Sequence, residues 1–136
     1  MLILEFDCRT PLYTNTHIMR LVNIVLALLF ALFAIVQYND PDPWLWIGIY
    51  SFIAIISGLA VAEIYPTWII RIGLAGCVIG LGILLPDFID WMSAGAESIT
   101  ETMKAEKPHI ELTREFLGLL LCALVMGLHL WQSEQK

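Results

Sequence analysis

The sequence carries little charge for its length. Charged residues make up 15% of the 136 residues, whereas an ordinary soluble domain carries about a quarter. Hydrophobic residues account for 59%, and the mean hydropathy is +0.78. The apolar residues form long blocks, and the charged residues fall in the gaps between the blocks. This pattern is typical of a chain that is solvated by lipid, and it predicts one membrane domain.

Basic residues and paired cysteines are also scarce. The formal net charge of −6 argues against a partner nucleic acid, which needs a basic face, and against a polybasic lipid-headgroup patch. Cys8, Cys77 and Cys122 provide no disulfide framework, and no cysteine or histidine pair has the spacing of metal ligands. Cys77 and Cys122 lie inside apolar blocks, so we expect them to be packing residues.

Four segments are long enough to cross a bilayer, which takes about 20 mostly apolar residues in a helix. The predicted spans cover residues 18–37, 44–62, 68–85 and 112–131. The remaining segments are a loose tail at 1–17, an outer loop at 86–111 and a second tail at 132–136. The sequence therefore predicts an all-α integral membrane four-helix bundle, built as two transmembrane hairpins that run up-down-up-down.

The start of the chain has two features that bear on processing. No small-x-small cleavage site precedes Gln37, so the first span is predicted to remain uncleaved. Met19-Arg20 would be a natural start for a membrane protein. One interpretation of the preceding tail is therefore an artefact of an upstream start site.

The distribution of lysine and arginine predicts the orientation. The side shared by both chain ends and the 62–71 loop holds Arg9, Arg20, Arg71 and Lys136. The opposite, outer side holds Lys104, Lys107 and Arg114. The basic positions closest to the spans favour cytoplasmic termini. In a bacterium this would place the protein in the inner membrane.

The first polar motif, Asn39-Asp40-Pro41-Asp42-Pro43, joins the first two spans. Each proline biases the preceding residue towards extended backbone, and Asp42 is predicted to be the N-cap of the second helix with Pro43 at N1. Alternatively, Asn39, Asp40 and Asp42 offer oxygen ligands to a divalent cation, but the glycine and glutamate of a calcium loop are missing. The cap-and-turn interpretation is favoured.

The second polar motif lies at the start of the fourth span. Glu111, Arg114, Glu115 and Gly118 recur on one helical face. They form either a solvated first turn that complements the helix dipole or a face that packs closely against another helix at Gly118. In the second case Arg114 would form an ionic latch with the first polar motif.

The outer loop contains two signals for helix ends. Residues 98–101 have the spacing of a capping box and predict a short helix. Pro108 is predicted to open the fourth helix from its first turn.

These two motifs also carry a resemblance to a known family. The relevant runs are Val36-Gln37-Tyr38-Asn39-Asp40-Pro41-Asp42 with Trp46 and Tyr50, and Glu111-x-x-Arg114-Glu115-x-x-Gly118-Leu119. Both are similar to motifs of the transmembrane protein 220 family. The resemblance covers roughly residues 19–131 and does not extend to the preceding tail. It implies a small four-helix membrane protein and implies no enzymatic activity or cofactor.

Two further features suggest association or cofactor binding. Gly76 and Gly80 form a close-packing motif in the third span, which packs against neighbouring helices of the chain or joins two copies as a homo-oligomer. A haem between His17 and His129 is conceivable but disfavoured, because neither histidine is predicted to lie deep in a span. No nucleophile–base pair, phosphate loop or zinc motif is recognisable, and no cofactor is evident.

Three functions remain open at this stage. The leading hypothesis is a non-enzymatic accessory or scaffold subunit that docks on another membrane protein through a polar outer face formed by the two motifs. The alternative is a divalent-cation or small-ligand site, with Asp40, Asp42, Glu111 and Glu115 as ligands. The third is a lipid-acting membrane enzyme with Asp40 as the base, for which the sequence offers no nucleophile.

Overall fold

The computed structural model describes residues 10–95 and 108–136, with side chains described for 16–95 and 111–136. These ranges form α1 (Thr10–Val36), a 3-10 turn η1 (Gln37–Asn39), α2 (Pro43–Val61), α3 (Thr67–Ser93) and α4 (Pro108–Glu134). Each of the four α-helices is long and apolar enough to cross a membrane. The all-α four-helix membrane architecture predicted from the sequence is therefore confirmed.

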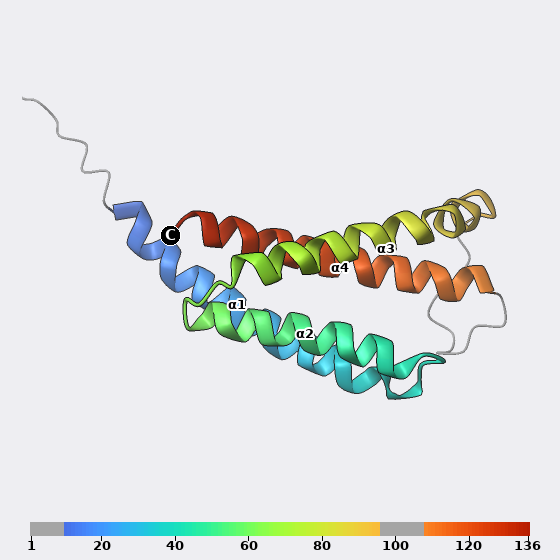
Figure 1. The fold of residues 1–136 in the computed structure, drawn as a ribbon, viewed down its shortest axis with the longest axis horizontal. Coiled ribbons are helices and arrows are strands. Elements are labelled where there is room, and N and C mark those ends of the chain that lie inside the picture. Colours follow the sequence, from blue (N-terminus) through green and yellow to red (C-terminus); the bar gives the residue numbers. More distant parts are fainter. Residues whose placement is uncertain (1–9, 96–107) are drawn as a thin grey trace, which may run out of the picture.

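The helices are arranged as two hairpins, α1 with α2 and α3 with α4 (Figure 1). The α2–α3 loop and the C-terminus lie at one end of the molecule, here called the terminal end. The α1–α2 turn, the end of α3 and the start of α4 lie at the opposite end, here called the turn end. Because the chain runs up-down-up-down, α2 and α4 are parallel, and the two hairpins meet mainly along these two helices.

The seam between α2 and α4 follows a spacing of alternately four and three residues. On α2 the buried residues of this stripe are Trp46, Tyr50, Ile53, Ser57 and Ala60. On α4 a matching stripe contains Glu115, Gly118, Cys122, Val125, His129 and Gln132. Contacts of Glu115, Gly118 and His129 with α2 place this stripe on the seam. The spacing is that of helices packed side by side as in a coiled coil.

The α3–α4 hairpin packs closely through small residues of α3. A Cβ atom on Gly80 would lie 2.7 Å from Leu119, and one on Gly73 would lie 2.6 Å from Met126. In contrast, nothing lies within 4 Å of such an atom on Gly76. Gly80 therefore packs inside the chain, while Gly76 lines an open apolar groove between α2 and α3. The predicted homo-oligomer through these glycines remains a prediction.

Large apolar side chains cover the outside of the helices. Leu28, Ile35 and Ile83 are about 70% exposed, at 68%, 71% and 70%. Such exposure over whole helices would be costly in water, whereas lipid tails are as apolar as the side chains themselves. The backbone polar groups are satisfied inside the helices, as a bilayer requires.

Three helix ends differ from the segment bounds predicted from the sequence. Helix α1 begins at Thr10, within the predicted tail, and α4 includes Gln132, which was assigned to the C-terminal tail. Helix α3 continues through Pro86 to Ser93, into the predicted outer loop. Proline removes one backbone hydrogen bond, but Phe88 stacks on Phe116 at 4.3 Å and holds this part of α3 against α4.

The described residues do not test the two predicted signals of the outer loop. Helix α4 includes Pro108, the first residue described after 95, and the first-turn proline remains a prediction. The predicted capping box at 98–101 lies outside the described residues.

Candidate functional site

The first polar motif forms a tight turn at the turn end. The Asp40 N–H donates to the Gln37 carbonyl at 3.0 Å, and Asp40 has extended backbone. Its carboxylate Oδ2 accepts a hydrogen bond from the Asp42 N–H at 3.2 Å. The Asp40 side chain therefore stabilises the turn itself, in the way that aspartate commonly does in loops.

Asp42 occupies the N-cap position of α2 with Pro43 after it, as the sequence predicted. Its side chain, however, makes no capping hydrogen bond. The reason is its backbone conformation, φ −116° and ψ 61°, since an N-cap residue normally has β-region dihedrals that aim its side chain at the helix. The expectation that Asp42 would cap α2 through its carboxylate, from extended backbone, was wrong.

The second polar motif meets α2 through Glu115 and Gly118. Glu115 Oε1 accepts a hydrogen bond from Trp46 Nε1 at 3.3 Å. The Tyr50 hydroxyl fills the space where a Cβ atom on Gly118 would lie. Of the two interpretations, the structure thus shows close packing against another helix, and that helix is α2. This polar and aromatic contact joins the two hairpins at the turn end.

A small cavity at the turn end brings both polar motifs together. It is lined by Gln37, Asp40, Trp46, Tyr50, Glu111, Arg114 and Glu115. Arg114 and Asp40 therefore lie around one cavity, while a direct ion pair between them remains a prediction. Asn39 and Asp42 are exposed beside it.

The geometry of this cavity does not favour a metal or an organic ligand. Its volume is about 90 Å³, room for about three water molecules, whereas small-molecule sites usually measure about 300 Å³ or more. Among the described residues, no three acidic, histidine or cysteine side chains converge to hold a metal ion. Arg114 also places a positive charge on the cavity that a cation would enter.

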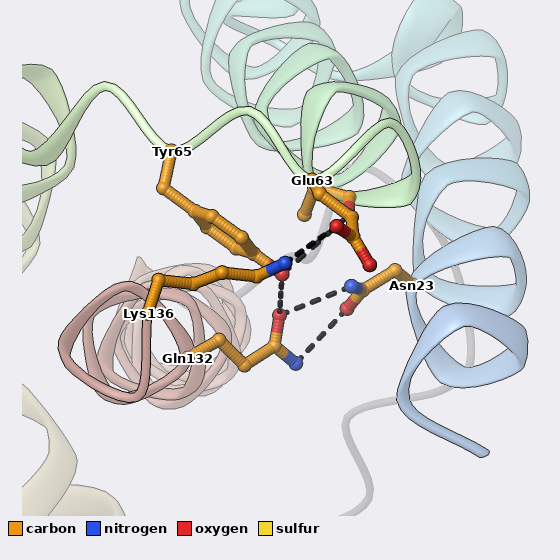
Figure 2. Close-up of polar contacts among 6 residues, drawn as sticks. Asn23, Glu63, Tyr65, Gln132 and Lys136 are labelled. Carbon is orange, nitrogen blue, oxygen red and sulfur yellow. Dashed lines mark hydrogen bonds and ion pairs between the residues drawn. The ribbon is translucent and has the colours of Figure 1, made fainter. Parts of the chain in front are cut away.

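The opposite, terminal end contains a buried polar network that the sequence did not reveal (Figure 2). Asn23 of α1 and Gln132 of α4 are 1% and 5% exposed. Their side-chain amides exchange two hydrogen bonds, Nδ2 to Oε1 at 3.0 Å and Nε2 to Oδ1 at 3.1 Å. Tyr65, in the α2–α3 loop, donates from its hydroxyl to Gln132 Oε1 at 3.1 Å. The network ties the first helix, the last helix and the loop together.

The loop that carries Tyr65 begins with a Schellman motif. The Ile64 N–H donates to the Leu59 carbonyl at 2.9 Å, and the Glu63 N–H donates to the Ala60 carbonyl at 3.0 Å. Glu63 holds the left-handed position of this motif, with φ 60°, where glycine is usual.

Two ionisable side chains of this loop interact with the end of α4. The Glu63 carboxylate pairs with the Lys136 ammonium at 2.6 Å (Figure 2), and this hydrogen-bonded partner lowers the pKa of Glu63. Burial raises the pKa of Tyr65, so its hydroxyl stays protonated and able to donate.

The network borders a second cavity, here called the terminal-end cavity, of about 340 Å³. Its lining comes from three parts of the chain: Thr16, Met19, Arg20 and Asn23 of α1, Ala60, Val61, Glu63 and Tyr65 around the α2–α3 loop, and Trp131, Gln132, Gln135 and Lys136 of the C-terminal segment. Asn23 and Gln132 supply its buried amides. This cavity is large enough for a small organic group.

One turn deeper than the amide pair, Ser57 and His129 form a buried contact between α2 and α4. Ser57 Oγ and His129 Nε2 lie 2.9 Å apart, and both residues are 0% exposed. The sequence showed no nucleophile–base pair, because these two residues are 72 positions apart. His129 is buried between α2 and α4, and His17 is exposed. The pair is sealed from solvent and serves here as an interhelical link.

Sequence reasoning missed the terminal end because its residues looked unremarkable singly. In the sequence, Asn23 is a polar interruption of the predicted first span, and Gln132 lies just beyond the predicted fourth span. A signal was nevertheless present: polar or small residues recur along α4 at the seam spacing, and α2 contributes Ser57 and Ala60. Such residues are enriched where transmembrane helices approach one another.

Four membrane-competent helices, paired as two hairpins and linked by buried polar contacts, define a polytopic helical membrane protein. The family model for transmembrane family 220, helix, matches residues 29–131. The match covers more than half of the chain, and the protein belongs to this family. The resemblance seen in the two polar motifs is thereby confirmed. A search of curated proteins and a search of solved structures each found no significant match.

Proposed function

We propose that this protein is a small accessory subunit that docks on another membrane protein through its turn-end face. The observation that carries the proposal is the exposed Asp42 carboxylate, which makes no helix-capping bond. It stands beside a contact region in which Trp46–Glu115 and Tyr50–Gly118 fix the two hairpins against each other. A surface held in this way is already organised for a partner, which reduces the entropy cost of binding.

The charge of the turn-end face indicates the chemistry of the partner. The carboxylates at this end of the described chain are Asp40, Asp42, Asp87, Asp90, Glu111 and Glu115. Arg114 is the basic residue among them. Complementary charge favours specific partners and rejects those of like charge, so the partner we propose presents lysine or arginine next to its membrane boundary.

The orientation of the chain belongs to the same proposal. In the sequence, Arg9, Arg20, Arg71 and Lys136 fall on the side of the chain ends, and Lys104, Lys107 and Arg114 fall on the other side. The basic positions closest to the spans favour cytoplasmic termini. The docking face would then lie on the opposite side of the membrane. A C-terminal reporter that is active only outside the cytoplasm would contradict this orientation.

Charge reversal tests the docking face. The tagged protein, its Asp42→Lys variant and the matched Glu134→Lys variant are purified in mild detergent from the native membrane, and co-purifying proteins are quantified by mass spectrometry. Glu134 is exposed at the terminal end, so Glu134→Lys makes the same charge change away from the proposed face. We expect one partner with basic membrane-flanking residues to fall at least about tenfold with Asp42→Lys, since like charges in an interface cost several kcal/mol.

Two results would contradict the docking proposal. In the first, the same proteins are recovered in equal amounts with all three forms, and Asp40→Ala and Arg114→Ala also leave recovery unchanged. In the second, Glu134→Lys reduces recovery as much as Asp42→Lys, which would show a general effect of charge.

A further inference from the structure

The terminal-end cavity lies at the level where the helices meet the membrane boundary. Trp131 lies close to the end of the last candidate span, and it lines the cavity. Tyr65 lines it as well, and tryptophan and tyrosine rings prefer the headgroup level of a bilayer. The α1 and α4 sides of the cavity belong to different hairpins, so the cavity sits between hairpins at headgroup depth.

Two cations line the cavity near the amide pair. Arg20 precedes Asn23 by one helical turn on α1, and Lys136 lies two residues beyond the end of α4 at Glu134. Both line the cavity together with the Glu63 side chain, and the positive charges of Lys136 and Arg20 lower the pKa of its carboxyl group. The Lys136 ammonium has three N–H donors, so its pairing with Glu63 leaves donors for a second acceptor. Counted over side chains, the lining holds two cations and one carboxylate, although the whole chain is acidic.

We propose that this cavity binds the headgroup of an anionic phospholipid, with the phosphate between Arg20 and Lys136. Basic pockets between transmembrane helices are a known means of holding such headgroups. The amides of Asn23 and Gln132 form the polar floor, and Gln135 offers a further amide to headgroup hydroxyls. The net charge of −6 argued against a polybasic surface, but most of the acidic residues that the structure describes lie away from this cavity, at the turn end. The inference is independent of the docking proposal.

Thermal unfolding of the purified full chain in a neutral maltoside detergent tests the site. A ligand that binds the folded state raises Tm in a concentration-dependent way. We expect phosphatidylglycerol to raise the Tm of the unchanged protein at concentrations where phosphatidylcholine and inorganic phosphate do not. The Arg20→Gln variant is expected to need about fivefold more phosphatidylglycerol, the effect of removing one basic contact near a lipid surface. The Arg20→Lys variant should retain most of the response.

Arg71→Gln is the matched control, because Arg71 is exposed at the same end and does not line the cavity. It should respond to phosphatidylglycerol as the unchanged protein does. If Arg71→Gln weakens the response to phosphatidylglycerol as much as Arg20→Gln does, the lipid is attracted to the charged surface and there is no specific site. If phosphatidylcholine raises Tm as much as phosphatidylglycerol does, the site has no preference for anionic lipid. A rise in Tm with inorganic phosphate alone would make the ligand a free anion. If Arg20→Gln does not fold, Lys136→Gln is tested instead, and native mass spectrometry measures how much phosphatidylglycerol stays bound to it. Retention equal to that of the unchanged protein overturns the proposal.

Discussion

The side-chain amides of Asn23 and Gln132 face each other in matched orientation, each donating to the other across 3.0 and 3.1 Å. The residues are 109 positions apart, Asn23 in the middle of α1 and Gln132 near the end of α4. Both side chains are almost fully buried, so few alternative hydrogen-bond partners are within reach of either amide. A reciprocal pair in this setting specifies how the two hairpins are placed, because any rotation of α1 or α4 breaks both bonds.

A double-mutant cycle should show that these two amides act together. Asn23→Leu or Gln132→Leu alone leaves one buried amide without its partner, a cost of about 1–3 kcal/mol. The double variant should lose less stability than the sum of the losses in the two single variants, with a coupling energy of about 0.5–1.5 kcal/mol. Reversible unfolding in detergent measures all four forms. Gln135→Leu, at an exposed amide of the same segment, should change stability little; additive effects in the cycle would contradict the coupling.

Substitution of Gly118 should separate the hairpins at the turn end. A Cβ atom there would collide with the Tyr50 hydroxyl, so Gly118→Ala should destabilise the protein by about 1–3 kcal/mol. Removing the hydroxyl leaves the nearest Tyr50 ring carbon at 3.6 Å, an ordinary contact. Tyr50→Phe combined with Gly118→Ala should therefore recover most of the stability. The measurement is unfolding in detergent for the single and double variants.

Gly76→Ala serves as the control for this experiment. It adds the same atom at a position with nothing within 4 Å, and alanine favours helix over glycine by about 1 kcal/mol. It should leave stability unchanged or slightly raised. Equal losses at Gly76 and Gly118 would contradict the packing described here.

Replacing Glu63 by glycine should raise Tm by a few degrees. Glu63 has φ 60°, a conformation that disfavours side chains with a Cβ atom and suits glycine. The pair with Lys136 that would be lost is between exposed groups, and exposed pairs contribute little. Glu63→Gln, which keeps the Cβ atom and removes the charge, should not raise Tm. If both variants lower Tm equally, the ion pair outweighs the backbone strain.

Purified protein should carry no stoichiometric divalent cation at the turn end. Asp40 is engaged with the Asp42 N–H, Glu115 accepts from Trp46, and Arg114 lines the same cavity. Elemental analysis after chelator-free purification measures the content. One equivalent of calcium or another divalent ion, lost in Asp40→Asn but retained in Glu134→Gln, would establish the metal site that the sequence offered as an alternative.

Hydropathy predicted the four helices because long apolar blocks leave a chain in lipid few other structures. For the same reason, hydropathy could not predict which faces of the helices pack against each other. In a water-soluble helix the apolar stripe marks the buried face, but here Leu28 and Ile53 are equally apolar while the first is 68% exposed and the second 1%. Ser57, Cys122 and His129 mark the buried face instead, so polarity is the informative signal in these spans.

The turn-end site was partly predictable. Asp40, Arg114 and Glu115 were expected near one another from helix spacing and the order of the spans, and they line one cavity. The missing cap of Asp42 was not predictable, because it depends on backbone dihedrals that the residue type alone does not determine.

The parallel seam between α2 and α4 has a consequence for assembly in the membrane. Each hairpin packs mostly within itself, so the first can insert before the second is synthesised. Ser57 and Trp46 would then face lipid without His129 and Glu115, the partners that complete their hydrogen bonds. Arrival of the fourth helix releases these groups from an unfavourable solvent. The polar side chains of the seam thus supply a driving force for joining the hairpins that their hydrocarbon surfaces, already satisfied by lipid, cannot provide.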